Sequence, residues 1–305
     1  MQKRCTVEVT YYPPPLALSP YFPTFALAEV EIDGPGLITD YLHPEWGTIR
    51  FHAGTPAHTV DYLGRNQPDL FFSVTGPSTR AVRFTVGSCR IWGIGMPPLG
   101  WARFVGLPAA GTADRVLNGQ HEPALARFLP LAQGLYGEER AVERELACLT
   151  DFFLALDAGL PPVPDAERIV AVHAALVDHE VSSVAQLVER VGFSHSTLER
   201  LCHRAFGFAP KQLLRRQRFI RSLAQYMLDP SLKWIGALDG HYHDQAQFVR
   251  EFRAFMGMSP RQYAALDLPV LRAATQARQR LAGAPMQALT GPVSPEPIAL
   301  GRAGS

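Results

Sequence analysis

Two patterns of hydrophobic and polar positions divide the chain. From residue 1 to about 120, short runs rich in β-branched and aromatic residues alternate with turns rich in Pro and Gly. Runs of this kind are typical of β-strands. The strand-like runs are Cys5 to Tyr12, Thr48 to His52, Asp69 to Val74, Ala81 to Val86 and Arg90 to Ile94. Residues 1–120 are therefore predicted to form an all-β domain, a barrel or a sandwich.

A helical pattern begins at about residue 121 and runs to about residue 160. Within Glu138 to Leu156, apolar residues recur at three- and four-residue steps, which predicts an amphipathic helix. We expect this apolar stripe to pack on the core of its own domain, and a dimer seam is the alternative. The Pro-rich run from Gly159 to Pro164 then predicts a stiff linker at a domain boundary.

Residues 166–268 have the spacing of an almost wholly helical domain. Residues 269–305 are expected to be a mostly disordered tail, because the stretch after Gly283 is dense in Gly, Pro, Ala and Ser. The chain is thus predicted to be an α+β multidomain protein. Its parts are a β-rich domain at 1–120, a helical segment at 121–160, an all-α domain at 166–268 and the tail.

An internal repeat organises the helical domain. When the second half of the chain is shifted by 50 residues against itself, Phe206 to Leu213 aligns with Met256 to Tyr263, and Leu198 aligns with Phe248. A repeat of this length indicates one supersecondary unit that is used twice.

The first unit has the sequence features of a helix-turn-helix. Ser183 and Gln186 form a capping box, Gly192 permits a tight turn, and Ser194 caps a second helix that extends to about Ala205. The apolar residues of that helix face inward, while its outer face is polar. A helix with such a face can enter the major groove of DNA. The candidate base-reading residues are His195, Ser196, Thr197, Glu199 and Arg200.

The second unit repeats this arrangement. A helix over about Ser231 to Asp239 precedes a turn, and Asp244 caps the next helix, which runs to Phe255. Gln can form two hydrogen bonds to adenine and Arg can form two to guanine. The candidate base-reading residues of this unit are Gln245, Gln247 and Arg250.

A long helix from Pro210 to Leu228 is predicted between the two units, with Pro in its first turn, where a missing N–H is harmless. Such a helix would fix the distance between the two reading helices. Net charge is +1 for the whole chain, but it is −5 for residues 1–165 and +3 for residues 166–268. Seven basic residues and no acidic one lie between residues 200 and 228, which indicates phosphate contacts, with a solvated helix face as the alternative. The candidate phosphate-binding residues are Ser194, Arg204, Lys211, Arg215, Arg218, Arg253 and Arg261.

These motifs resemble the DNA-binding domain of the AraC/XylS family of transcription regulators. The resemblance rests on Leu198 to Phe219, Tyr242 to Phe248 and Gly257 to Pro260. It implies a monomeric reader with two helix-turn-helix motifs. Tyr12 to Pro15, Gly76-Pro77 and Gly93 to Pro98 resemble the cupin-like sensor domains found ahead of many such readers, which implies that the N-terminal domain is a cupin-like β-barrel. His241 and Gly236 depart from the family pattern, so the first helix of the second motif is expected to be weak or shifted. Base contacts are therefore expected mainly from the first motif.

The β-rich domain offers candidates for a ligand site. His43, Glu45, His52 and His58 suggest a metal, but no pair of His separated by one residue is followed by a Glu, as a cupin metal motif requires. No metal, cofactor or catalytic motif is expected, and an enzyme with cupin-type metal chemistry remains the alternative. Aromatic residues that could line an effector pocket, or could be plain core, are Trp46, Phe51, Phe72, Trp92 and Trp101.

The expected function is sequence-specific transcription regulation through double-stranded DNA, without catalysis. A small effector, RNA polymerase and a second copy of the chain are the further candidate partners, and an architectural DNA-binding protein without sequence preference is a third hypothesis. No apolar run approaches the roughly 18 to 20 residues needed to span a bilayer, so we expect a cytoplasmic protein without a membrane partner. The four widely spaced cysteines predict neither a disulfide framework nor a zinc site.

Overall fold

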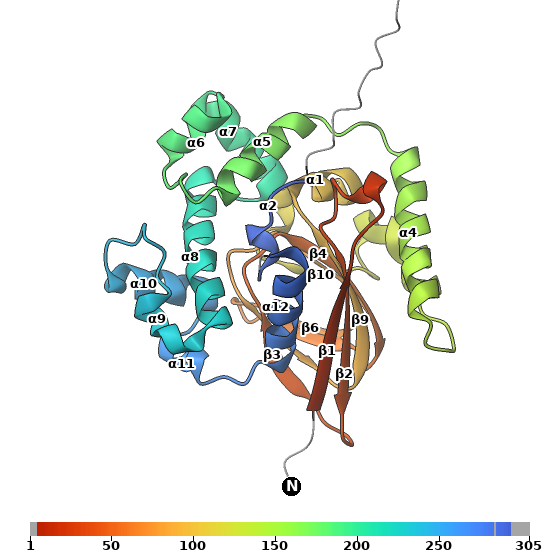
Figure 1. Cartoon of the computed structure of the whole chain (residues 1–305). Helices are drawn as coiled ribbons and strands as arrows, with labels where there is room; N and C mark the ends of the chain where they lie inside the picture. Colours follow the sequence, from red (N-terminus) through yellow and green to blue (C-terminus); the bar gives the residue numbers. More distant parts are fainter. Residues whose placement is uncertain (1–4, 284, 294–305) are drawn as a thin grey trace, which may run out of the picture.

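The computed structural model describes residues 5–283 and 285–293 (Figure 1). Its N-terminal half contains a six-stranded sheet of order β1-β2-β9-β4-β7-β10 and a four-stranded sheet of order β3-β8-β5-β6. All the paired strands are antiparallel. The strands are β1 Cys5–Tyr12, β2 Phe25–Ile32, β3 Ile38–Leu42, β4 Gly47–Gly54, β5 Ala57–Val60, β6 Asn66–Leu70, β7 Phe72–Thr75, β8 Val82–Val86, β9 Cys89–Met96 and β10 Val116–Asn118.

The two sheets face each other as a sandwich. Ile91 of the larger sheet and Phe84 of the smaller sheet belong to one buried cluster between them. The predicted sheet-rich domain is confirmed, but the closed barrel is wrong, because no strand pairing among the described residues joins the two sheets. The opening between β1 and β3 is instead covered by helix α12, Pro269–Ala282, which packs along both strands (Figure 1).

The expectation of a disordered tail is therefore wrong for residues 269–282. The first turn of α12 is held by Asp40 of β3, whose Oδ2 accepts hydrogen bonds from the backbone N–H groups of Val270 (2.8 Å) and Leu271 (3.1 Å). Beyond this helix, Met286, Gln287 and Ala288 are also buried. The part of the predicted tail from residue 294 onward lies outside the described residues.

The two faces of the larger sheet carry different kinds of side chain. On β4, Ile49 and Phe51 point into an apolar cluster on the outer face, whereas Thr48, Arg50 and His52 point toward the smaller sheet. This alternation is what the period of two residues along a strand requires.

Helix α4, Val142–Gly159, covers the outer face of the larger sheet. Leu149 and Phe153 of its apolar stripe are fully buried there, against the larger sheet. The buried carboxylate of Glu145 fixes the helix to β9, accepting hydrogen bonds from Arg90 Nη1 (2.7 Å) and Trp92 Nε1 (2.7 Å).

The C-terminal half is helical, as predicted. Figure 1 shows α8 running between the group formed by α5, α6 and α7 at one end and the group formed by α9, α10 and α11 at the other. The remaining helices are α1 Pro98–Gly100, α2 Ala109–Thr112, α3 Leu129–Gly134, α5 Ala166–Val177, α6 Val184–Val191, α7 His195–Leu201, α8 Pro210–Leu228, α9 Lys233–Gly236, α10 Gln245–Met256 and α11 Pro260–Ala264.

The 50-residue repeat is visible in the helix ends. Ser194 and Asp244 both act as N-caps, each accepting a hydrogen bond from the backbone N–H three residues later. Gly207 and Gly257 both end their units in the left-handed conformation, with φ of 87° and 71°. The predicted long helix also begins at Pro210 and ends at Leu228.

The first helix of the second unit is shorter than its counterpart. It spans only Lys233–Gly236, whereas we expected Ser231 to Asp239. The chain first forms a 3-10 turn at Pro230–Leu232, and Lys233 follows it with a positive φ of 53°, which delays the start of α9; Gly236, a poor helix former, lies where α9 ends. The departure that Gly236 makes from the family pattern thus coincides with a weakened helix.

The helical half and the sandwich share one apolar core. Trp46 of the sandwich packs edge-to-face on Phe206 and on His173, with ring centroids 5.8 Å and 5.3 Å apart. None of the helices in the described part of the chain is both long enough and apolar enough to cross a membrane.

Candidate functional site

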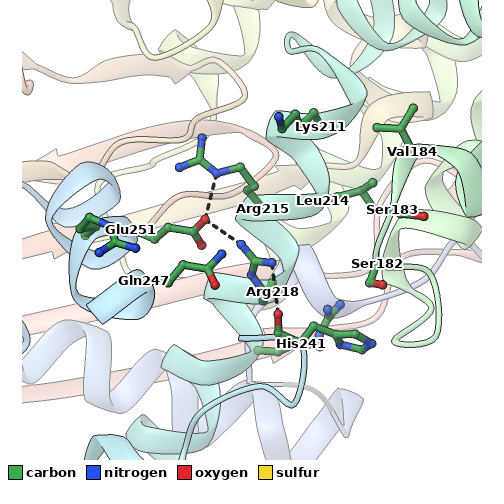
Figure 2. Close-up of a pocket in the computed structure, with 12 residues that line it drawn as sticks. Ser182, Ser183, Val184, Lys211, Leu214, Arg215, Arg218, His241, Gln247 and Glu251 are labelled. Carbon is green, nitrogen blue, oxygen red and sulfur yellow. Dashed lines mark hydrogen bonds and ion pairs between the residues drawn. The ribbon is translucent and has the colours of Figure 1, made fainter. Parts of the chain in front are cut away.

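A groove of about 650 Å³ lies between α6, α8 and α10 (Figure 2). It receives Ser183 from the start of α6, and Gln247 from α10. Its basic side chains come from the long helix α8 and from α10. They include candidates for phosphate binding and one candidate for base reading, Arg250. They are Lys211, Arg215, Arg218, Arg221 and Arg250.

A buried carboxylate organises this groove. Glu251 of α10 accepts hydrogen bonds from Arg215 Nε (2.9 Å), Arg218 Nη2 (2.7 Å) and the hydroxyl of Tyr242 (2.9 Å), as Figure 2 shows for the two arginines. Burial and the Glu251 carboxylate both raise the pKa of Tyr242, so that the hydroxyl stays protonated and donates. Glu251 thereby connects α8 to α10.

The two arginines on Glu251 differ in what they leave accessible. The side chain of Arg215 is 44% exposed, and only its Nε is used by Glu251. The side chain of Arg218 is 14% exposed and also donates to the backbone oxygen of His241, with its guanidinium 4.6 Å from the Tyr242 ring. Arg215 therefore remains available to an anion in the groove, whereas Arg218 mainly supports the protein itself.

Asp239 holds the turn of the second unit against α8. Its carboxylate pairs with Arg221, and with Nδ1 of His241 at 2.9 Å, while its backbone N–H donates to Ser222 Oγ at 2.8 Å. Burial alone opposes ionisation of Asp239, but the hydrogen bonds from Arg221 and His241 keep its pKa below the usual value. His241, an unusual residue at this position, thus has a defined structural partner.

The predicted reading face of α7 is accessible. His195, Glu199 and Arg200 are exposed, and no side chain in the described chain forms a hydrogen bond or an ion pair with them. Ser196 is exposed too, while Thr197 is half-buried and its Oγ1 lies 2.9 Å from Ser194 Oγ. This face therefore offers several unused polar groups to a partner.

The predicted contacts on the second unit are placed less uniformly. Gln245 and Arg250 of α10 are exposed, but Gln247 is half-buried and its Oε1 accepts a hydrogen bond from the backbone N–H of His243 at 3.2 Å. Arg253 and Arg261 are exposed on α10 and α11. Gln247 is thus partly committed to capping its own helix.

Two other arginines already have partners within the protein, one in the first unit and one on α8. Arg204 Nη2 donates to Asp165 Oδ2 at 2.5 Å, close to the start of α5. Arg216 belongs to the cluster of seven basic residues between positions 200 and 228 that predicts phosphate contacts, and for this residue the prediction is wrong. Its side chain is completely buried beneath Trp46, facing the sandwich and not solvent.

A second candidate site is a cavity of about 190 Å³ between the two sheets, lined on one side by α12 and residues 285–287. Of the aromatic residues proposed as pocket lining, Trp46 lines it. The other four do not, because they belong to the cluster on the outer face of the larger sheet: Phe51, Phe72, Trp92 and Trp101.

Three of the candidate metal ligands do meet at this cavity. His43, Glu45 and His52 line it, whereas His58 is exposed. Within residues 5–283 and 285–293, no group of three or more His, Cys, Asp or Glu side chains has an arrangement that could hold a metal ion. Burial lowers the pKa of both His43 and His52 to about 3, so both imidazoles are neutral at pH 7.

The cavity residue Arg50 was missed from sequence. The signal was present in Thr48-Ile-Arg-Phe-His52, where polar and apolar residues alternate on a strand whose two faces are both inside the protein. Reading those positions required knowing that a second sheet covers the polar face.

The fold and the groove define a helix-turn-helix DNA-binding protein. Residues 168–265 match the family model described as a helix-turn-helix domain. This segment is similar to the DNA-binding domains of AraC-type transcription regulators.

Solved structures with a similar arrangement share little sequence with this chain. ToxT from Vibrio cholerae O395 is 11% identical, with a TM-score of 0.40, over 85% of this chain and 96% of that one. Wild-type ToxT from Vibrio cholerae strain SCE256, bound to an unsaturated fatty acid, is 10% identical, with a TM-score of 0.41, over 86% and 95%. The AraC-like transcriptional activator CuxR is 14% identical, with a TM-score of 0.31, over 72% and 81%. No curated protein sequence matches this chain.

Proposed function

We propose that this chain is a cytoplasmic, sequence-specific transcription regulator that binds one DNA duplex with both helix-turn-helix motifs under the control of a small effector. The observation that carries this proposal is the basic groove, which gathers Lys211, Arg215 and Arg250 between the two motifs. In this proposal α7 and α10 enter the major groove, and the basic side chains along α8 contact the phosphates between them.

The length of α8 supports binding to neighbouring turns of DNA. At 1.5 Å per residue, a helix of 19 residues is about 28 Å long. Successive major grooves on one face of DNA are about 34 Å apart. A straight helix of this length can therefore hold the two motifs at a spacing that one duplex accommodates.

We assign residues 166–268 to DNA binding, residues 1–120 to effector sensing and residues 121–160 to support of the sensor. The wall of the cavity between the two sheets is attached directly to α8, because Arg216 Nη1 donates to the backbone oxygens of Glu45 and Ser78, both at 3.2 Å. Glu45 and Ser78 also line the cavity. A ligand that moves this wall would therefore move α8.

A second attachment reaches the reading helix of the second unit. The backbone N–H of Ala81 donates to the oxygen of Phe255 at 2.8 Å, and Arg80 donates to the oxygen of Ala254. Coupling between two sites requires an element that both sites bias. In this proposal, that element is α8 together with the C-terminal end of α10.

Selection of bound genomic DNA fragments by the full chain tests the proposal. We expect an asymmetric preferred site of about 17 to 20 base pairs, as two motifs on neighbouring turns require, with affinity that falls steeply as salt rises. Equal affinity for random competitor DNA would contradict sequence-specific regulation and favour an architectural protein.

A further inference from the structure

The cavity between the two sheets has a polar wall. Arg50 and His52 project into it from β4, opposite the apolar side of the same strand. Space remains around them, since a Cβ atom added at the neighbouring Gly93 would meet nothing closer than Ala26 at 3.9 Å. Polar residues of β4 therefore line a cavity at a place where a β-sandwich ordinarily has packed apolar side chains.

Positive charge exceeds negative charge in this wall. Arg50 and Arg278 line the cavity together with one carboxylate, that of Glu45. Across the described residues, neither arginine forms an ion pair. Arg50 Nη1 donates to Thr75 Oγ1 at 2.8 Å, and the Arg278 guanidinium lies 4.5 Å from the ring of Tyr11. Glu45 Oε1 is already occupied by the backbone N–H of Gln287 at 3.1 Å.

Other charges near the cavity do not remove this excess. Arg216 adds a third guanidinium behind Glu45, and Asp40 uses its carboxylate on the first turn of α12. A buried charge without a partner is costly, and proteins ordinarily neutralise it. The wall therefore has an electrostatic preference for an anion.

Unused hydrogen-bonding atoms also point to a missing partner. His52 is 6% exposed, and among residues 5–283 and 285–293 neither of its ring nitrogens has a hydrogen-bond partner. Gln287 is 1% exposed, and its Nε2 is likewise unpartnered, as is Nη1 of Arg278. Buried polar atoms are normally satisfied, so several such atoms around one cavity indicate a polar occupant.

We propose that this cavity binds a small organic monocarboxylate, with its carboxylate facing Arg50 and Arg278 and its short apolar body against the apolar wall. Ala26, Ala28 and Ile91 supply part of that wall. The volume of about 190 Å³ is below the roughly 300 to 1,000 Å³ of pockets for drug-sized ligands, which limits the acid to a small one. This inference deepens the effector part of the proposed function, but binding itself does not depend on DNA.

Calorimetric titration and thermal unfolding of the full chain test the site. The probes are butyrate, hexanoate and benzoate, each compared with its amide (butyramide, hexanamide or benzamide), and inorganic phosphate. We expect at least one acid to bind saturably and raise Tm, with its amide at least tenfold weaker and phosphate without effect. Absence of binding by all three acids, equal binding of acid and amide, or tighter binding of phosphate overturns the proposal.

Variants separate the site from the rest of the fold. Arg50→Gln and Arg278→Gln should each weaken binding of the acid at least tenfold, and Gly93→Val should abolish it by filling the space without changing any charge. Arg272→Gln is the matched control, because Arg272 is exposed on α12 and pairs with Asp267 at 2.8 Å. Circular dichroism checks that each variant is folded. Unchanged affinity in folded Arg50→Gln and Gly93→Val proteins overturns the assignment.

DNA affinity measured with and without the acid distinguishes this inference from the proposed function. Binding of the acid together with a change in DNA affinity supports both. Binding of the acid with unchanged DNA affinity supports the site and contradicts effector control. Specific DNA binding by a protein that binds none of the acids overturns this inference and leaves the DNA-binding proposal standing.

Discussion

The guanidinium of Arg216 lies 3.8 Å from the ring centre of Trp46, so that a cation on the long helix α8 stacks on an aromatic residue of the sandwich. Burial lowers the pKa of Arg216 to about 9, and its Nε and Nη2 have no hydrogen-bond partner in the part of the chain that the structure describes. This contact joins the DNA-binding half to the wall of the cavity. The contact between Arg216 and Trp46 is specific, but it requires the charge of Arg216 to be removed from water.

Arg216→Met should loosen this connection without unfolding the protein. Loss of the stacking contact and of two hydrogen bonds is offset by removal of a buried charge, so we expect the free energy of unfolding to change by less than about 2 kcal/mol. Amide hydrogen exchange around Glu45 and Ser78 should become faster. Arg215→Met, on the next residue but exposed, is the matched control and should leave that exchange unchanged. Unaltered exchange in Arg216→Met would argue against the connection.

Arg200 and Arg215 should contribute to DNA binding in different ways. Arg200 is exposed on the reading face of α7, so Arg200→Ala should reduce discrimination at one base pair by about 1 to 3 kcal/mol. Arg215 faces the groove, so Arg215→Ala should weaken binding to all sequences alike and lower the salt dependence. Competition assays with point-mutated sites separate the two effects. A changed base preference in Arg215→Ala would contradict its assignment to phosphate.

Glu251→Gln should weaken the attachment of α10 to α8. The substitution removes the charge that Arg215 and the mostly buried Arg218 share, and breaking a buried pair costs about 3 to 5 kcal/mol. The partial exposure of Arg215 reduces this, so we expect about 1 to 3 kcal/mol. Chemical denaturation measures the loss, with Arg253→Gln on the exposed side of the same helix as control. Equal stability of the two variants would mean that the Glu251 pairs contribute nothing.

Stability should fall as the pH is lowered below about 6.5. Burial lowers the pKa of His43, His52 and His173 to about 3, so each is neutral in the folded protein but takes up a proton on unfolding below its ordinary pKa of 6.5. Each histidine can therefore remove up to about 1.4 kcal/mol per pH unit between 6.5 and 3. Asp40 acts in the opposite direction, because burial raises its pKa to about 6 and its protonated form favours folding as the pH drops.

Urea denaturation between pH 7 and pH 5 checks this expectation. His173→Phe should make the pH profile shallower, because it removes one of the three histidines while preserving a ring beside Trp46. His195→Gln, on the exposed face of α7, should leave the profile unchanged. A profile in His173→Phe as steep as that of the original protein would contradict the role of His173.

Asp40→Ala should weaken the attachment of α12. Loss of an N-cap costs about 0.5 to 2 kcal/mol, and Asp40 accepts hydrogen bonds from both Val270 and Leu271. We expect faster hydrogen exchange in α12 and unchanged exchange in α4, which packs elsewhere on the sandwich. Uniform exchange changes across both helices would indicate general destabilisation and not a local cap.

The helical half was predictable because its signals are local. Capping residues such as Ser183 and Ser194, and a turn glycine such as Gly207, act within a few residues of the helix ends that they define. The 50-residue repeat then predicts the helices of the second unit from those of the first. Its one departure, the short α9, was anticipated from Gly236 for the same reason.

The sandwich was less predictable because its closure depends on contacts between distant segments. Nothing near Val270 indicates that Asp40, some 230 residues earlier in the chain, caps its helix. The burial of Arg216 did have a local signal. It stands three residues after Leu213 and four before Ile220, which are both fully buried, so its place on the inner face of α8 could have been read from helical spacing.

The position of α12 bears on how this protein can be divided for study. Cutting at the proline-rich segment after Gly159 would give an N-terminal fragment without the helix that lies along β1 and β3, and those strand edges would then be open to other chains. Such a fragment should aggregate. A shortened protein that retains the sandwich, with residues 269–293 rejoined to it, is the form in which the sandwich could be isolated.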